Sequence, residues 1–319
     1  MSTADLKWRA WQQAMIRAAR SGALRRLMQG NPLTRQLARR FVGGASAAEA
    51  LQTVNRLARD RRLGSPYYLG EYVDSLALVQ RNVEEICAAL ETFRAASLPT
   101  FFSVDPTQIG YSISGAVGEE NALRIAAAFG NRSGIRFLMV DMEDASYVDR
   151  TIALYHTLRD QGVRVAITLQ AYLRRTEQDL ERLLGQGATV RLVKGAFTAG
   201  KDIAWTRKRE VDAAYQRLAL RLLAPEMRAR GTYPILATHD EPMLDVLLPV
   251  VRSHGWQPDE FEIEMLLGVR EALQRRLANE GHTVRVYVPF GTAWWPYTAR
   301  RVGENPANLR FVLQALWGR

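Results

Sequence analysis

The last repeating unit of the chain is VRVYV at residues 284–288, followed by YTARRVGE at residues 297–304. Residues 284–288 alternate in a way that predicts a β-strand, and the second segment has helical spacing. Four polar or charged side chains then project from one helix face, at i, i+3, i+4 and i+7: Tyr297, Arg300, Arg301 and Glu304. Adjacent guanidiniums suit a carboxylate or phosphate placed between them. The stretch predicts either a solvated, ion-paired face or an anion-binding face.

This strand-then-helix pattern repeats along the chain from about residue 64. The strand-like segments lie at residues 67–72, 99–104, 135–141, 163–169, 189–194, 233–238, 261–265 and 284–288. The helical segments lie at residues 75–93, 119–129, 147–161, 177–185, 211–223, 242–254, 270–280 and 296–304. Eight such units in series predict a (β/α)8 barrel over residues 64–319. A doubly wound sheet is the alternative, but the glycine-rich phosphate turn expected after its first strand is missing.

The positive charge of the chain is concentrated at its N-terminus. The net charge is +10, and residues 1–63 contain thirteen Lys or Arg and three Asp or Glu, whereas the remaining 256 residues hold thirty of each sign. Residues 6–20 place Trp and Met at helical spacing among basic residues, which predicts an amphipathic helix in an N-terminal arm, residues 1–63. Such a helix either lies on an anionic membrane surface or packs its apolar stripe on the barrel. Because no base-reading motif accompanies it, we expect no nucleic acid partner.

Composition excludes several other classes of protein. The only cysteine, Cys87, lies in a helical pattern, so a disulfide framework or a cysteine-based zinc site is excluded. The apolar runs are too short for a membrane span, and the N-terminus lacks the apolar region of a secretory signal. These features favour a cytoplasmic protein, with peripheral membrane association through the arm as an additional expectation.

A barrel places its functional residues at the carboxyl ends of its strands. Those ends are unusually polar here: Asp105, Asp141, Gln170, Lys194, Thr238, His239, Asp240 and Tyr287, with Leu266 as the apolar exception. The acidic members and His239 suggest a divalent metal for hydrolytic or aldol chemistry as one possibility. Several cations at the same rim, including Arg191 and Lys194, repel a metal and attract phosphates and carboxylates. A phosphorylated cofactor with an anionic substrate fits this rim better, and we expect no metal.

Five motifs, taken together and in order, resemble the proline dehydrogenase family. They are DMED at residues 141–144, LQAYL at 169–173, RLVKGAF at 191–197, ATHD at 237–240 and YxxRRxxE at 297–304. The resemblance runs from about Arg40 to Trp317. It implies an FAD-dependent barrel that oxidises L-proline to Δ1-pyrroline-5-carboxylate and passes the electrons to a quinone or another acceptor. It also accounts for the missing glycine-rich turn, because this family holds FAD on a barrel.

The resemblance implies a role for each matched residue. Arg191 would lie against the flavin N5 edge, where hydride arrives. The other implied FAD contacts are Met142, Gln170, Val193, Lys194, Gly195, Ala196, Thr206, Lys208, Thr238 and His239. Arg300 and Arg301 would clamp the substrate carboxylate, and Asp141 would orient Tyr287 by a hydrogen bond. The remaining substrate contacts implied are Asp105, Leu266, Tyr297 and Glu304.

Four positions depart from the family pattern, and they gather on the substrate side. In the segment SVDPTQIG at residues 103–110, Asp105 replaces a lysine that helps to bind the substrate carboxylate. Tyr67 stands where an aspartate is usual, Phe197 where a tyrosine is common, and Glu264 where a glutamine is common. A related cyclic amino acid is therefore an alternative substrate. A metal-dependent lyase or hydrolase and a non-catalytic relative are the further alternatives.

The charge of the N-terminal arm generates a prediction about membranes. Deleting residues 1–20 should weaken binding to anionic vesicles, because each basic residue near such a surface contributes about 1 kcal/mol, and should leave flavin reduction unchanged. Co-sedimentation at low salt measures the binding, with neutral vesicles as the control. If the intact protein ignores anionic vesicles, the helix packs on the barrel instead.

Overall fold

The structure is a computed structural model. It describes residues 38–70, 73, 75–96, 98–130, 135–197 and 199–304, together with the single residues 21, 28 and 34. For residues 300 and 302–304 only the backbone is described. The amphipathic helix predicted within residues 1–20 lies outside the described residues.

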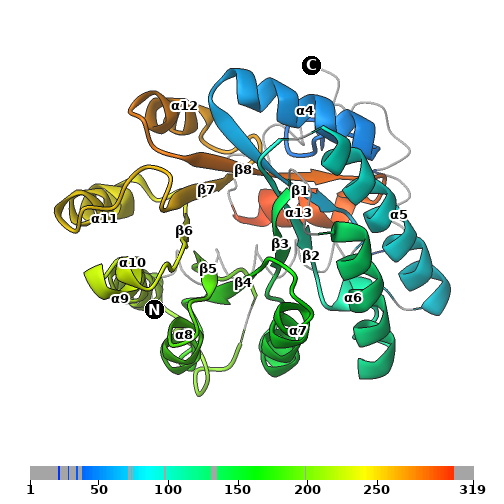
Figure 1. Ribbon diagram of the computed structural model, residues 1–319, viewed down its shortest axis with the longest axis horizontal. Coiled ribbons are helices and arrows are strands. Elements are labelled where there is room, and N and C mark those ends of the chain that lie inside the picture. The colour runs from blue at the N-terminus through cyan, green and yellow to red at the C-terminus, as the bar shows by residue number, and fades with distance from the viewer. Residues whose placement is uncertain are drawn as a thin grey trace.

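Eight parallel strands form a closed barrel in sequence order, and helices surround it (Figure 1). The strands are β1 (Arg62–Tyr68), β2 (Thr100–Val104), β3 (Ile135–Val140), β4 (Val165–Gln170), β5 (Thr189–Val193), β6 (Pro234–Ala237), β7 (Glu262–Leu266) and β8 (Val284–Phe290). The helices are α4 (Ala47–Arg59), α5 (Leu76–Ala95), α6 (Gly115–Phe129), α7 (Val148–Asp160), α8 (Thr176–Leu184), α9 (Lys208–Leu222), α10 (Pro225–Ala229), α11 (Glu241–Ser253), α12 (Glu271–Asn279) and α13 (Trp294–Glu304). Short 3-10 helices span Thr107–Ile109 and Ala145–Tyr147. The predicted barrel is confirmed.

One predicted strand is misplaced. The first strand was expected at residues 67–72, but β1 spans Arg62–Tyr68, so the expected boundary between arm and barrel at residues 63 and 64 falls inside it. The aromatic residues after 66 favour a strand by propensity, whereas RLGS at residues 62–65 does not. Closure of the barrel decides the outcome, because β1 pairs with β8 in unbroken register from Arg62 opposite Val284 to Tyr68 opposite Phe290.

Helix α4 occupies the outer position that would normally belong to the helix after β8. It packs against β1, β8 and α5, and Figure 1 shows it between α12 and α5 in the outer ring. Gly64 of β1 permits this close approach, because a Cβ there would lie 2.6 Å from a methyl group of Val54. In Figure 1, α13 instead crosses the middle of the barrel, and its side chains pack with Tyr67 and Tyr287. The displaced last helix therefore covers the carboxyl ends of the strands.

The amino-terminal end of the barrel interior is closed by a buried ion pair. Arg285 and Glu262 are both fully buried, and Arg285 Nε donates to Glu262 Oε2 at 2.5 Å. The same guanidinium donates to the carbonyl oxygens of Gly64 and Pro99, and it lies 3.6 Å from the ring centre of Phe101. These contacts link β8 to β7, to β1 and to the segment before β2. A buried charge needs such full compensation, because its desolvation is costly.

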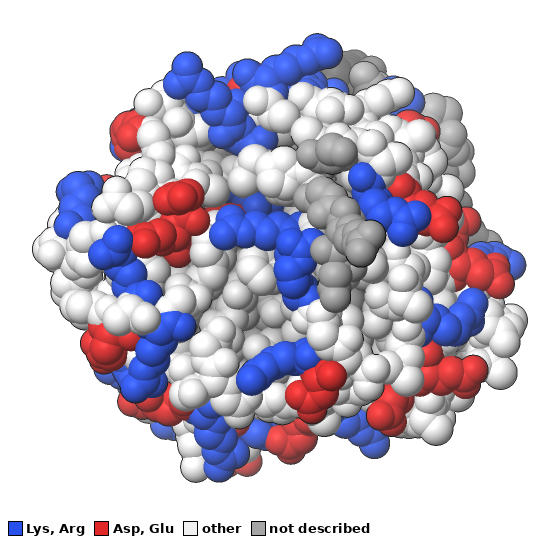
Figure 2. Space-filling view, in the orientation of Figure 1, with Lys and Arg blue, Asp and Glu red and all other residues white. Residues whose placement is uncertain are grey.

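Figures 1 and 2 view the molecule from this amino-terminal end. The strand–helix units follow one another clockwise from α5 to α12 in Figure 1. Because crossovers between parallel strands are right-handed, this order means that the strands point away from the viewer. Figure 2 shows Lys and Arg side chains around a hollow in the middle of this face. This basic face is opposite the end where a barrel carries its functional site.

The Arg285–Glu262 pair generates a stability prediction. Glu262→Gln should lower the free energy of unfolding by about 3–5 kcal/mol, because it leaves a buried guanidinium without its counter-charge. Urea denaturation followed by circular dichroism measures the loss. The matched control is Glu280→Gln, which removes the half-exposed pair with Arg276 and should cost less than about 1 kcal/mol. Similar losses in the two variants would contradict the role assigned to the buried pair.

Candidate functional site

A second buried arginine lies above the first, toward the carboxyl ends of the strands. Arg191 of β5 is 5% exposed and forms ion pairs with Asp141, which follows β3, and with Glu264 of β7. Its Nη1 lies 3.2 Å from Glu264 Oε1, and its Nε donates to Thr168 Oγ1 of β4 at 3.0 Å. Three other segments of the barrel thus hold one guanidinium in a single orientation.

Two tyrosines extend this cluster toward β1 and β2. Tyr287 of β8 donates to Asp141 Oδ2 at 2.7 Å, the hydrogen bond that the family resemblance implied. Tyr67 of β1 stacks on Tyr287 with ring centres 5.4 Å apart, and it donates to Asp105 Oδ2 at 2.5 Å. Two tyrosine-to-aspartate hydrogen bonds therefore lie side by side. The two departures Tyr67 and Asp105 are partners, which the sequence alone did not indicate.

Burial and charge act together on the titratable groups of this cluster. Burial opposes the charged form of Arg191, but Asp141 and Glu264 more than offset it, so its pKa lies above the ordinary value. Burial raises the pKa of Asp141 and of Glu264, and in both cases Arg191 reduces the rise. Burial, reinforced by Asp141 and Asp105, raises the pKa of Tyr287 far above its usual range. Arg191 is thus a permanent cation and Tyr287 a permanent hydrogen-bond donor.

The end of β4 presents polar atoms to the same region. Gln170 is 3% exposed, and its Nε2 donates to the carbonyl oxygen of Met142 at 3.2 Å. Among the described residues its Oε1 has no hydrogen-bond partner, although it is buried. A buried acceptor without a partner is costly, so Gln170 Oε1 is available to a donor from a bound group or a water molecule.

The segment after β5 carries the predicted phosphate contacts. Val193 and Lys194 are partly buried, and Gly195 and Ala196 are exposed. Gly195 has a φ of +105°, and a Cβ there would lie 2.2 Å from the ring of Tyr172, so the turn requires glycine. The backbone after β5 is therefore open for approach by a ligand.

Lys194 and Lys208 share two carboxylates. Lys194 Nζ donates to Asp212 Oδ1 and to Asp240 Oδ2, both at 2.5 Å, and Lys208 donates to Asp212 Oδ2 at 2.5 Å. Thr206 lies partly buried just before the start of α9. The structure brings the two predicted lysines together, but an anion that binds them competes with Asp212 and Asp240. That competition was not apparent from the sequence.

Strands β6 and β7 end beside one another at the rim. Thr238 is 5% exposed and accepts from the backbone N–H of Asp240, and His239 Nε2 accepts from the N–H of Leu266 at 3.4 Å. Burial, with Arg301 and Arg270 nearby, lowers the pKa of His239 to about 4, so the ring is neutral near pH 7. Its Nδ1 is buried with no hydrogen-bond partner among the described residues.

Helix α13 brings the C-terminal motif over the barrel. Tyr297 is 4% exposed and packs in one cluster with Tyr67, Tyr287 and Leu266. The guanidinium carbon of Arg301 lies 5.1 Å from the ring centre of Tyr297. Arg300 and Glu304 belong to the same helix, but their side chains are outside the described residues. The i and i+4 members of the predicted stripe thus lie together at the site.

Two residues of the cluster were missed by the sequence reasoning. Glu264 was noted only as a departure from a family pattern, and Thr168 was not considered. Strand alternation was the available signal, because Glu262 and Glu264 lie two residues apart on β7 and must face the same side. That signal shows a shared face but not which cation each carboxylate meets.

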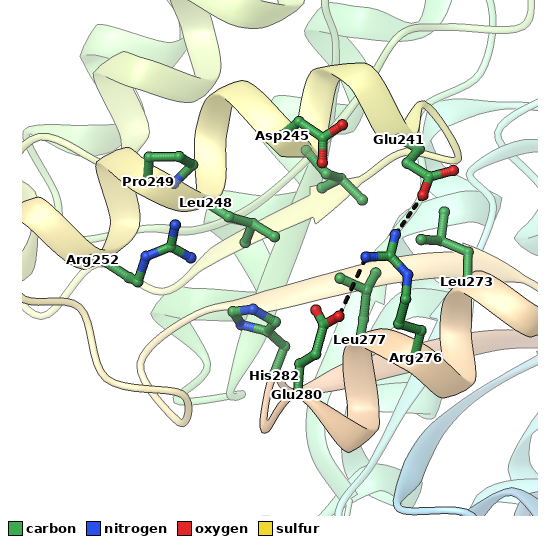
Figure 3. A pocket seen from close by; sticks show the side chains of 11 residues that line it. Glu241, Asp245, Leu248, Pro249, Arg252, Leu273, Arg276, Leu277, Glu280 and His282 are labelled. Atoms are coloured by element: carbon green, nitrogen blue, oxygen red, sulfur yellow. Dashed lines mark hydrogen bonds and ion pairs between the residues drawn. The ribbon is translucent and has the colours of Figure 1, made fainter.

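A groove between α11 and α12 lies outside this site. It encloses about 170 Å³ and is lined by side chains such as Leu244, Asp245, Arg252 and His282. Figure 3 shows Arg276 between Glu241 and Glu280, reaching both. None of the residues predicted for the site lines it.

Two kinds of feature are absent from the described part of the chain. No group of three or more His, Cys, Asp or Glu side chains in this part of the chain is arranged to hold a metal ion. In the same part of the chain, no helix has both the length and the apolar character to cross a membrane.

Comparison with known sequences connects this geometry to one family. Residues 50–314 match the family model described as proline dehydrogenase. The proline dehydrogenase of Deinococcus radiodurans is 36% identical over 285 residues, covering 88% of this chain and 90% of the relative. Proline dehydrogenase 1 of Bacillus subtilis (strain 168) is 34% identical over 287 residues, covering 89% of this chain and 91% of the relative.

Comparison with solved structures shows the same fold. The structure of proline utilization A from Bdellovibrio bacteriovorus, inactivated by N-propargylglycine, superposes with a TM-score of 0.77 at 23% identity, covering 85% of this chain. Proline utilization A from Corynebacterium freiburgense gives 0.73 at 21% identity, covering 97% of this chain. This chain spans about a third of the length of each, 33% and 35% respectively.

Proposed function

The chain belongs to the proline dehydrogenase family, and on that premise we propose that it oxidises L-proline to Δ1-pyrroline-5-carboxylate with FAD as hydride acceptor. The observation that carries the proposal is the buried guanidinium of Arg191, which Asp141, Glu264 and Thr168 hold in one orientation. A fixed cation in a water-poor site stabilises negative charge that develops beside it.

The residues at the rim fit a flavin nucleotide. Gln170 Oε1 is a buried acceptor and His239 Nδ1 a buried ring nitrogen, and neither has a partner among the described residues. A flavin with its ribityl chain offers both donors and acceptors to such atoms. The lysines after β5 and at the start of α9 supply cations for a pyrophosphate, provided that Asp212 and Asp240 yield to it.

Each predicted cofactor residue keeps a definite part in this proposal. Arg191, Met142 and Gln170 would contact the isoalloxazine, and Val193, Lys194, Gly195 and Ala196 the ribityl and phosphate groups. Thr206, Lys208, Thr238 and His239 would complete the phosphate and adenosine side. When bound, FAD supplies the two-electron acceptor that the oxidation requires.

The substrate side is built around the tyrosine stack. Arg301, with Arg300 as its proposed partner, would bind the substrate carboxylate by a paired fork. Tyr297 and Leu266 would pack against the substrate ring, and Glu304 would position Arg300 and Arg301. Because the hydroxyl of Tyr287 donates to Asp141, Tyr287 would contact the substrate through its ring and would not supply a proton. The chain's own residues thus orient the substrate and exclude water, and none is required to form a covalent bond.

The Tyr67–Asp105 pair bears on which amino acid is oxidised. A carboxylate at position 105 repels a substrate carboxylate, by an amount of about 1–3 kcal/mol at intermediate dielectric. A cyclic amino acid that carries an additional donor group would turn this repulsion into a hydrogen bond. Oxidation of such a relative of proline is therefore the second candidate, and the specific feature that favours it is Asp105 at the rim.

Electrons must leave the reduced cofactor for an external acceptor. We propose a quinone or another small acceptor in this role. The basic segment 1–20 would then bring the protein to a membrane surface that holds quinone, in line with the charge excess of the arm.

The cofactor proposal predicts the colour of the protein. The purified protein should show flavin bands, release FAD on denaturation and bleach anaerobically with L-proline. Arg191→Met should lower the free energy of unfolding, because Asp141 and Glu264 lose their counter-charge. In the folded variant it should slow flavin reduction by about 10²–10³-fold, the range for loss of one preorganised charge or donor. Stopped-flow absorbance measures the rate. Release of FMN alone, or of no flavin, would contradict the proposal.

The Asp105 proposal predicts a change in substrate preference. Asp105→Lys should lower the KM for L-proline about tenfold, because a repulsive charge beside the carboxylate becomes attractive, with a smaller effect on the hydride step. Arg301→Met should raise that KM. Both variants are compared with the wild type on proline, hydroxyprolines, pipecolate and thiazolidine carboxylate. Identical profiles for wild type and Asp105→Lys would show that Asp105 does not meet the substrate.

A further inference from the structure

The carboxylate of Glu264 is the least explained group inside the barrel. Glu264 is 3% exposed on β7, and its Oε1 accepts from Arg191 Nη1 at 3.2 Å. Its Oε2 is buried and has no hydrogen-bond partner among the described residues. A neutral glutamine of the same shape would keep the contact to Arg191 without burying a charge. The negative charge is therefore the property that distinguishes Glu264 from a glutamine at this position.

The charges around Arg191 do not balance. Asp141 and Glu264 both form ion pairs with this one guanidinium, so among the described residues Arg191 has two carboxylate partners. In the lower layer the ratio is reversed, because Glu262 pairs with Arg285 at 2.5 Å and also lies 3.8 Å from Arg136. Tyr287 donates to Asp141 and leaves Glu264 without such support. The excess negative charge is consequently centred on Glu264.

We propose that Glu264 is a positioning residue that acts through Arg191 and sets the reduction potential of the flavin. This inference rests on the proposed function, since it requires the flavin beside Arg191. A lone guanidinium favours the reduced cofactor, which gains negative charge. A carboxylate 3.2 Å from that guanidinium cancels part of its field. The bound flavin is thus harder to reduce than Arg191 alone would make it.

The test is the midpoint potential of the bound flavin in three variants of the full chain. Glu264→Gln keeps the shape and removes the charge, and it should raise the potential by at least a tenfold change in the reduction equilibrium, about 30 mV for a two-electron couple. Glu264→Asp keeps the charge but withdraws it by one methylene, and it should raise the potential by less. Glu271→Gln is the control, because it removes a half-exposed charge on α12 and should leave the potential unchanged. Spectroelectrochemistry with reference dyes gives all values.

The outcomes separate this inference from the function on which it rests. Protein that binds FAD and bleaches with L-proline, but has the same potential in the wild type and in Glu264→Gln, overturns the inference alone. Protein without flavin in every form overturns the proposed function. If Glu264 has a purely structural role, the substitutions change stability, but the potential does not rise from the wild type through Glu264→Asp to Glu264→Gln. If Glu264→Gln does not fold, an unchanged or lower potential in Glu264→Asp overturns the inference.

Discussion

The burial of the Arg191 guanidinium is the constraint on which the rest of the site depends. A charge at this depth is tolerated only when carboxylates and hydrogen bonds surround it. Asp141, Glu264 and Thr168 meet that need from three other strands or strand ends, and Tyr287 in turn fixes Asp141. Because each partner belongs to a different part of the barrel, the site cannot form before the barrel closes. The same contacts therefore determine both the geometry of the proposed flavin site and the stability of the barrel interior.

The barrel interior contains two buried arginines that pair with glutamates, one in each of two stacked layers. Strand β7 supplies an inward glutamate to each layer, Glu262 to Arg285 and Glu264 to Arg191. The lower pair is fully enclosed, with its remaining guanidinium donors satisfied by backbone carbonyl oxygens, and it closes the amino-terminal end. The upper arginine instead lies below the rim, where the residues proposed to bind cofactor and substrate gather. The same residue chemistry supports structure at one depth and function at the other.

Helix α4 occupies the position where the helix after β8 would normally pack. This placement determines how the proposed substrate side is built. Because α4 occupies the outer position beside β8, α13 does not pack there and lies over the carboxyl ends of the strands. Its aromatic residues pack on Tyr67 and Tyr287 and bring Arg301 to the site. A residue of the proposed substrate site is therefore held by a helix, whereas most of the proposed cofactor residues are held by strands and the turns after them. The four departures from the family pattern do not follow this division, because Tyr67, Asp105, Phe197 and Glu264 all lie on strands or in the turns after them.

The sequence by itself determined the eight-fold alternation of strand and helix, the polar strand ends and the matched motifs, because these are local patterns of period, propensity and spacing. It placed β1 five residues late, since the closing register with β8 is a non-local property that overrides the weak propensity of residues 62–65. Only the tertiary structure decided that Tyr67 bonds to Asp105, that Lys194 is shared by Asp212 and Asp240, and that Glu264 meets Arg191. Alternation along a strand says which face a side chain occupies, but its partner across the barrel depends on stagger and depth, which are set when all eight strands close.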